Sequence, residues 1–156
     1  MIIKVDKLTS PEIKALLQEH HLDMLKHSPA ESVHALDLSA LKADNITFWS
    51  AWINNELAGC GALKALSNNH GEIKSMRTAK KHLRKGVAAK LLQHILTHAT
   101  ALGFEMISLE TGTADAFMAA QKLYRGFGFK PCPPFADYKA DPYSLFLTKT
   151  IKEHKS

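Results

Sequence analysis

Residues 71–78 run GEIKSMRT, and after four more residues the chain continues as LRKGVAAKLLQHIL (83–96). The first segment predicts a β-strand, and the apolar residues that recur after Gly86 predict a strongly amphipathic helix. The N-terminus of a helix carries unpaired N–H groups and the positive end of the helix dipole. Gly86 lets an anion approach that backbone, and Arg84 and Lys85 add positive charge beside it. This strand, turn and helix therefore predict a phosphate or pyrophosphate site.

The elements on either side of this unit predict the fold class. Ser10-Pro11-Glu12 has the N-cap, the proline and the acid of a helix start, and this helix is expected to reach about His27. The other expected elements are a strand at 1–5, a short helix at 31–41, an antiparallel meander at 45–52, 57–66 and 71–78, a strand at 104–110, a helix at 115–125 and a strand at 143–150. This order predicts one α+β domain over residues 1–156, with a mixed, mostly antiparallel sheet flanked by helices.

The overall composition excludes several classes of protein. The chain has 156 residues, and the 46% that are hydrophobic exclude a disordered protein. No apolar run approaches the roughly 18 residues of a membrane helix, and the start of the chain reaches a charge at Lys4, unlike a secretory signal. The two cysteines, Cys60 and Cys132, are expected as free thiols in a reducing compartment. We therefore expect a cytoplasmic protein with no membrane partner.

Positive charge is concentrated in one short segment. Seven of the 20 Lys and Arg residues lie between Lys74 and Lys90, a span without acidic residues, and the rest of the chain is close to neutral. Such a cluster favours an anionic partner, either a polyanion or a small phosphorylated ligand, and a solvated face is the alternative. The span contains no Phe, Tyr or Trp on which bases of a single strand would stack, so we expect no nucleic-acid partner.

Three matches carry a family resemblance: the strand at 71–76, which has Glu72 where many members have a catalytic Glu, and two motifs that follow it. Residues 83–88 (LRKGVA) match Gln/Arg-x-x-Gly-x-Gly/Ala except at Leu83, and residues 123–129 (LYRGFGF) match Leu-Tyr-x-x-x-Gly-Phe, with Phe117 where an Asn often precedes. In this order and spacing they resemble the acetyl-CoA-dependent N-acetyltransferases of the GNAT superfamily. Residues 134–144 (PFADYKADPYS) also resemble a branch of mostly uncharacterised bacterial members.

This resemblance implies a GNAT fold and acetyl-CoA as co-substrate. It implies that the turn at 84–89 holds the CoA pyrophosphate and that residues 76–78 bond the pantetheine arm like an added strand. The expected cofactor-binding residues are Met76, Arg77, Thr78, Arg84, Lys85, Gly86, Val87, Ala88 and Ala89. His94 and His98 share one helix side, but no third ligand accompanies them, so no metal is expected.

Acetylation of an amine requires groups that move protons, because an alkyl ammonium has a pKa near ~10. Glu72 stands where many family members carry a catalytic Glu and is expected as the general base; an ion pair with Lys74 is its alternative. Tyr124 is expected to protonate the departing thiolate, and a packing role at the helix end is its alternative. Direct transfer without an acyl-enzyme is expected, with a backbone N–H near Met76 meeting the oxyanion.

The acceptor site is inferred from strand 71–78 and two segments outside it. Strand alternation is expected to place Glu72, Lys74 and Met76 on one face and Ile73, Ser75 and Arg77 on the other. Arg77 is a candidate for holding a substrate carboxylate, and contact with a CoA phosphate is its alternative. The resemblance adds His34, from the helical region that helps form the acceptor pocket in this family, to orient the substrate or act as an alternative base; a histidine on the helix surface is its alternative. Phe135 completes the candidate site from a proline-rich loop (residues 131–142) that is expected to cover the substrate with Tyr138. We therefore expect a small, amino-acid-like primary amine as the acceptor.

Two other functions stay open on sequence alone. The Lys74–Lys90 cluster is compatible with a non-enzymatic nucleic-acid or polyanion binder, and the motifs are compatible with a GNAT fold that only senses acyl-CoA. Salt-dependent DNA binding that ignores CoA favours the first, whereas CoA binding without turnover of amines favours the second. A homodimer is left open as well.

Overall fold

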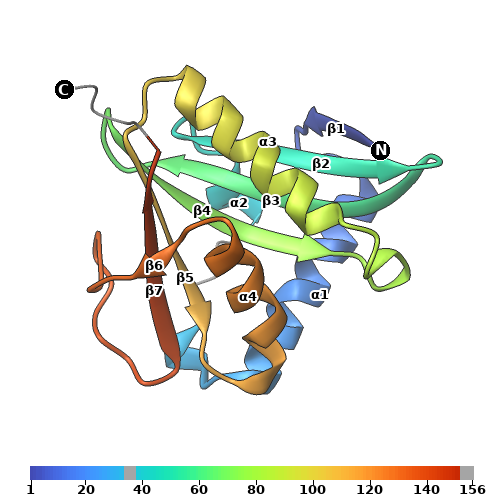
Figure 1. Cartoon of the computed structure of the whole chain (residues 1–156). Coiled ribbons are helices and arrows are strands. Elements are labelled where there is room, and N and C mark those ends of the chain that lie inside the picture. Colours follow the sequence, from blue (N-terminus) through green and yellow to red (C-terminus); the bar gives the residue numbers. More distant parts are fainter. Residues whose placement is uncertain (34–37, 152–156) are drawn as a thin grey trace.

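A seven-stranded sheet organises the computed structural model, which describes residues 1–33 and 38–151 (Figure 1). The strands are β1 (Ile2–Val5), β2 (Ile46–Ile53), β3 (Glu56–Ala65), β4 (His70–Thr78), β5 (Met106–Gly112), β6 (Lys130–Pro131) and β7 (Ser144–Thr150). Their order across the sheet is β1-β2-β3-β4-β5-β7-β6, and every neighbouring pair is antiparallel except β4 and β5. The predicted mixed, mostly antiparallel sheet is confirmed.

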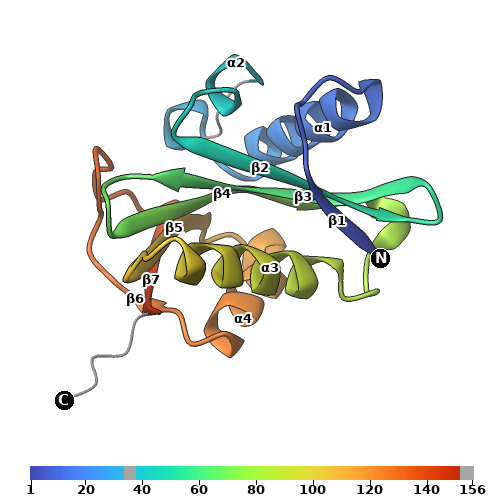
Figure 2. The ribbon, with the colours of Figure 1, turned by 90° about the horizontal axis from the view of Figure 1, so that it is seen from above.

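Helices cover both faces of this sheet (Figure 2). Helices α1 (Pro11–His27) and α2 (Leu38–Leu41) lie on one face, and α3 (Val87–Ala101) and α4 (Met118–Gly126) lie on the other. Short 3₁₀ turns occur at Ala30–Ser32, Lys80–His82 and Asp115–Phe117. The buried side chains form two clusters, one that includes Trp49 and Leu91 and one that includes Ile13 and Phe48. The sheet thus lies between two apolar layers, one on its α3 face and one on its α1 face.

Helix α1 begins as the sequence predicts, and its buried stripe points toward the functional region. The Ser10 hydroxyl accepts a hydrogen bond from the Ile13 N–H at 3.2 Å, and the proline after Ser10 occupies the first turn. Ile13 and Leu16 are buried against the sheet, and His20 and Met24 continue the stripe as half-buried residues. The inner face of α1 therefore changes from apolar core to a polar histidine along its length.

The prediction of one continuous helix over residues 31–41 is wrong. The chain forms a 3₁₀ turn that ends at Ser32 and becomes extended at Val33 (φ −93°, ψ 116°), and α2 begins at Leu38. The Ser32 hydroxyl donates to the Asp141 carboxylate at 2.6 Å, which ties this turn to the proline-rich loop instead of continuing the helix. His34, a candidate acceptor-site residue, lies outside the described residues.

Strand β4 contains a bulge in its outer half. The flanking pairs of the β3–β4 ladder are Cys60–Arg77 and Ala62–Lys74. Ser75 and Met76 therefore both lie opposite the single residue Gly61, and Ser75 takes a left-handed backbone with φ +57°. A second residue opposite one partner is the definition of a β-bulge, and it reverses the alternation of side chains beyond it.

The bulge makes the expected alternation of β4 wrong. Arg77 lies on the α1 face with Lys74, since it bonds carboxylates of α1 and pairs with the buried Cys60 of the α1-side cluster. Met76 instead packs on the α3 face with Ile73. Strict alternation would have separated Arg77 from Glu72 and Lys74, whereas the extra residue brings all three to one side of the sheet.

Strands β4 and β5 are the one parallel pair in the described sheet, and they separate early. Their pairing runs only from His70–Met106 to Ile73–Leu109, although both strands continue beyond it. Figure 1 shows the two strands diverging beyond the paired part. The separation opens the middle of the sheet on the side where the bulge lies, and the functional cavities occupy this opening.

Candidate active site

Two cavities meet where β4 and β5 part. The larger is about 540 Å³ and lies among the end of β4, the start of α3, α4 and α1. The smaller is about 110 Å³ and lies between β4 and β5. The residues that line both cavities are His20, Met24, Met76, Phe117, Ala120 and Tyr124. The two spaces are therefore neighbours across one shared wall, which is the arrangement that two substrates of a transfer reaction need.

The larger cavity is built from the residues that the sequence assigned to the cofactor. Its lining includes Met76, Arg77, Thr78, Arg84, Gly86, Val87, Ala88 and Ala89. Lys85 is the exception among the expected residues. It does not line the cavity, and its Nζ lies 3.1 Å from Nδ1 of His82.

The start of α3 has the geometry of an anion cradle. Gly86 is the N-cap residue with φ +78°, and a Cβ added to it would meet no atom within 4 Å. Lys90 donates its N–H to the Gly86 carbonyl at 3.1 Å, so the N–H groups of Val87 to Ala89 form the open first turn. Arg84, also left-handed at φ +64°, stands beside them. These residues fit a pyrophosphate group, because its charge would meet backbone donors, the helix dipole and a guanidinium.

The smaller cavity contains a buried carboxylate held by two partners. Glu72 is only 2% exposed, and the Tyr138 hydroxyl donates to its Oε2 at 2.5 Å. Lys74 Nζ lies 3.2 Å from the same oxygen and 2.7 Å from the Tyr138 hydroxyl. Burial and the Glu72 carboxylate raise the pKa of Tyr138, so its hydroxyl stays a donor. The ion pair between Glu72 and Lys74, expected as the alternative to a general-base role of Glu72, is present. Glu110 is a second acidic residue in the lining of this cavity.

The proline-rich loop reaches the cavity through Tyr138 and not through Phe135. Tyr138 lines the smaller cavity, whereas Phe135 is absent from its lining. The Phe135 ring packs against Tyr138, Phe146 and His70 with centroid distances of 5.1, 5.9 and 6.0 Å. Phe135 therefore supports the tyrosine that meets Glu72, and the expected covering of this space by the loop depends on Tyr138.

Tyr124 lies on the wall shared by the two cavities. Its side chain is 6% exposed, its ring packs edge-on against Phe129, and burial raises the pKa of its hydroxyl. That hydroxyl forms no hydrogen bond with any other residue in 1–33 or 38–151. Phe117 stands where the family often has Asn, and it closes the same wall by packing over Gly112. An aromatic surface thus replaces a polar amide at this position.

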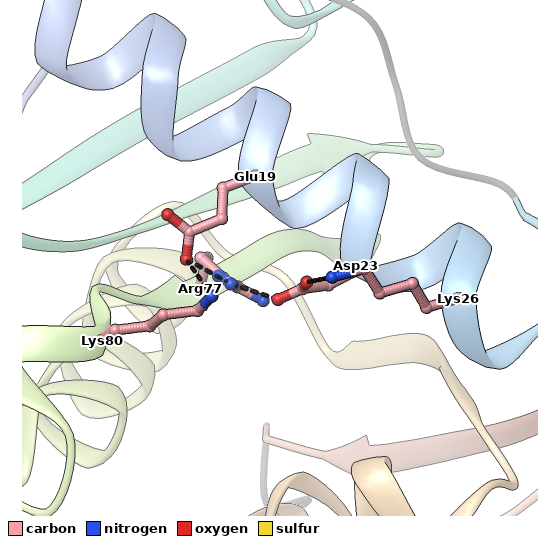
Figure 3. Close-up of polar contacts among 5 residues, drawn as sticks. All are labelled: Glu19, Asp23, Lys26, Arg77 and Lys80. Atoms are coloured by element: carbon pink, nitrogen blue, oxygen red, sulfur yellow. Dashed lines mark hydrogen bonds and ion pairs between the residues drawn. The ribbon is translucent and has the colours of Figure 1, made fainter.

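Arg77 links β4 to α1. Figure 3 shows its guanidinium between Glu19 and Asp23, with N–O distances of 2.6 and 2.5 Å. Lys80 lies 3.9 Å from Glu19, and Lys26 lies 3.7 Å from Asp23. The hydrogen bond from Arg77 lowers the pKa of the Asp23 carboxyl. Because Arg77 already holds two carboxylates, this arrangement does not favour the expectation that it receives a substrate carboxylate.

His20 is the functional candidate that motif analysis missed. It lies in α1 between the two partners of Arg77, and it lines both cavities. Burial, with a smaller effect from the Arg77 charge, lowers the pKa of its imidazole to about 4, so the ring is neutral near pH 7. A polar residue on the apolar stripe of α1 was the available sequence signal, because it follows Leu16 at helical spacing.

Two members of the Lys74–Lys90 cluster, Lys74 and Arg77, are set apart from the other five basic residues, which are exposed. Lys74 and Arg77 are 9% and 16% exposed and are paired with carboxylates on the α1 face, whereas Arg84 and Lys90 are exposed near the start of α3. This division fits a local phosphate site better than a broad polyanion surface. Among the described residues, no helix has both the length and the apolar character needed to cross a membrane.

Comparison with known proteins identifies the family. The family model described as Acetyltransferase (GNAT) family matches residues 12–129, which include both cavities' main elements. The chain belongs to the GNAT acetyltransferase family. Acetyl-CoA is the acetyl donor of this family, and the chain is an acetyltransferase.

One relative and two solved structures show what this chain is similar to in sequence and in fold. The uncharacterized N-acetyltransferase YsnE of Bacillus subtilis (strain 168) is 56% identical over 151 residues, which are 97% of this chain and 100% of the relative. A putative acyl-CoA N-acyltransferase from Klebsiella pneumoniae superposes with a TM-score of 0.77 at 25% identity, covering 97% of each chain. A GNAT family acetyltransferase from Elizabethkingia anophelis, solved with acetyl-CoA bound, gives a TM-score of 0.68 at 20% identity, covering 96% and 97%.

The pKa of His20 predicts a pH dependence of folding. Between its ordinary value of 6.5 and about 4, the unfolded chain binds a proton that the folded chain does not, so the free energy of unfolding falls as pH falls. We expect His20 to account for about 1–2 kcal/mol of loss between pH 7 and pH 5. Urea unfolding at both pH values should show that His20→Gln removes this part of the loss. His21→Gln, at the exposed neighbour, should retain it; equal profiles for wild type and His20→Gln would show that His20 is not buried as neutral imidazole.

Proposed function

We propose that this GNAT enzyme transfers the acetyl group of acetyl-CoA directly to a primary amine of a small molecule. The observation that supports this most is the meeting of two cavities at Tyr124 and Met76, one with an anion cradle and one with carboxylates. Direct transfer needs both substrates at the same time, each held on its own side of the reacting atoms. Cys60, which is fully buried with a pKa raised to about 12 by burial, is unsuited to carry an acyl group.

In this proposal the larger cavity holds acetyl-CoA. The N–H groups of Val87 to Ala89 and the Arg84 side chain hold the pyrophosphate, and Gly86 leaves room for it. The backbone of residues 76–78 bonds the pantetheine arm, and the N–H of Met76 at the bulge meets the oxyanion. Lys85 contributes long-range charge only, because its amine is turned to His82.

The smaller cavity holds the acceptor. Among the described residues of its lining, two carry carboxylates, Glu72 and Glu110, and Lys74 carries a positive charge, so the cavity can accept a cationic ammonium group. Glu72 accepts the first proton of that group, while Lys74 and Tyr138 fix the direction of its carboxylate. A volume of about 110 Å³ favours a small molecule over a peptide side chain with its backbone. An amino-acid-like amine stays within the proposal, although Arg77 is already paired.

Tyr124 is proposed as the acid that protonates the departing thiolate. The raised pKa keeps its hydroxyl protonated, and its place on the shared wall brings it within reach of both substrates. A group that donates a proton as charge develops on the leaving atom typically contributes 10²–10⁴-fold to the rate.

The proposed binding of the acetyl-CoA pyrophosphate at the start of α3 predicts the effect of Gly86→Glu. The new carboxylate would occupy the anion cradle and repel the pyrophosphate, so we expect acetyl-CoA binding measured by calorimetry to weaken at least ~100-fold. Gly103→Glu is the matched control, because it adds the same charge at an exposed site that also has a left-handed backbone (φ +89°) and no atom within 4 Å of the new Cβ. Unchanged affinity in a folded Gly86→Glu protein would contradict the cofactor assignment.

The proposed proton donation by Tyr124 during acetyl transfer predicts the kcat of Tyr124→Phe. Purified wild type, supplied with acetyl-CoA and a panel of small primary amines, should release free thiol and form N-acetyl products identified by mass spectrometry. Tyr124→Phe keeps the ring but lacks the donor, so kcat should fall roughly 10²-fold with little change in CoA affinity.

Two results would count against the proposed acetyl transfer with Tyr124 as the acid. If Tyr124→Phe has the same kcat as wild type, the Tyr124 hydroxyl donates no proton in the reaction, and the ring only packs against its neighbours. CoA binding with no turnover of any amine in the panel would favour an acyl-CoA sensor over an enzyme acting on small amines.

A further inference from the structure

His20 occupies a position that none of the proposed steps uses. It is one of the residues that line both cavities, and with Tyr124 it is one of the two among them with a side chain able to exchange a proton. It approaches the shared wall from α1, whereas Tyr124 approaches it from α4. In the proposed function, the nitrogen of the acceptor amine attacks the acetyl carbon at this wall. Two groups that can exchange a proton, one from each face of the sheet, therefore border the reacting atoms.

The imidazole of His20 has no hydrogen-bond partner among the described residues. Neither ring nitrogen forms a hydrogen bond with another residue in the described part of the chain, 1–33 and 38–151. By contrast, the Oε2 atom of Glu72 already receives bonds from Tyr138 and Lys74. A neutral imidazole carries one acceptor nitrogen. Because burial and the nearby Arg77 charge disfavour the imidazolium, His20 can hold a proton at this wall only briefly and passes it on readily.

The ion pairs of Arg77 fix where this imidazole lies. Glu19 and Asp23 precede and follow His20 in α1, and both bond the Arg77 guanidinium of β4. The helix turn that carries His20 is thus tied to the same strand that carries Glu72 and Met76 (Figure 3). This attachment positions His20 relative to β4 without using either of its ring nitrogens.

Formation of an amide from an ammonium group removes two protons from one nitrogen. The first leaves before the nitrogen can attack, because the ammonium has no lone pair. The second leaves once the nitrogen is bonded to the acetyl carbon, which the proposed function puts at the shared wall. An acceptor at that wall can take the second proton while Glu72 still holds the first.

We propose that His20 is a catalytic residue that accepts this second proton, an inference that rests on the proposed acetylation of an amine. As the C–S bond breaks, its electron pair goes to sulfur, and Tyr124 donates its hydroxyl proton to that sulfur. His20 then returns its proton to the Tyr124 oxygen. Both residues are restored, and one proton in total leaves to solvent through Glu72.

A labelling experiment on the wild-type protein tests the position of His20. Diethyl pyrocarbonate modifies neutral imidazoles, and peptide mass spectrometry locates the modified residues. We expect CoA to slow modification of His20 at least ~5-fold and to leave the exposed neighbour His21 unchanged. Equal modification of His20 with and without saturating CoA would overturn the inference, because the imidazole would then not border the cofactor.

A kinetic experiment tests the chemical role. His20→Gln should lower kcat roughly 10²-fold while the KM values for acetyl-CoA and amine change less than about threefold. In His20→Ala, added imidazole should restore part of kcat, an effect that a structural role would not give. His21→Gln should match wild type. An unchanged kcat in His20→Gln, or a loss in His20→Ala that imidazole does not relieve, would overturn the inference.

These results separate the two proposals. Amine turnover by wild type that falls in Tyr124→Phe but not in His20→Gln supports the proposed function and overturns the role of His20. Absence of amine turnover in wild type contradicts the proposed function and, with it, the proton transfer assigned to His20.

Discussion

The early separation of β4 from β5 is the constraint on which the functional region depends. Two parallel strands normally continue their ladder, but here pairing stops at Ile73–Leu109, and β4 continues past its bulge at Ser75 and Met76 paired with β3 alone. The backbone groups freed at this point face a space instead of a neighbouring strand. Both cavities open into that space, so the sheet itself is the scaffold that brings the substrates together.

The ion pairs around Arg77 extend this scaffold to α1. Their side chains are between 16% and 37% exposed, so they are better shielded than surface pairs, which contribute about 0–1 kcal/mol. Leaving the Arg77 charge without partners would also cost its desolvation, because the guanidinium is largely covered. The network therefore holds the α1 wall of both cavities at a fixed place against β4.

Features encoded by neighbouring residues could be predicted from the sequence. The N-cap at Ser10 and the helix start at Gly86 each follow from local chemistry. The resemblance to GNAT enzymes added the family and its donor, both of which are confirmed.

Features that depend on distant residues could not be predicted. The partners of Arg77 lie 58 and 54 residues away, and Tyr138 lies 66 residues from Glu72. A bulge changes the register by one residue without a distinctive sequence. The prediction that Arg77 lies on the opposite face of the sheet from Glu72 was therefore wrong.

The central claim is that acetyl transfer takes place at the wall shared by the two cavities. A crystal structure of the protein with acetyl-CoA tests it most directly. We expect the pyrophosphate at the N–H groups of Val87 to Ala89 and the thioester carbon on the wall between Tyr124 and His20, facing the cavity of Glu72. A cofactor whose thioester lies outside this junction, with the smaller cavity closed off from it, would contradict the claim.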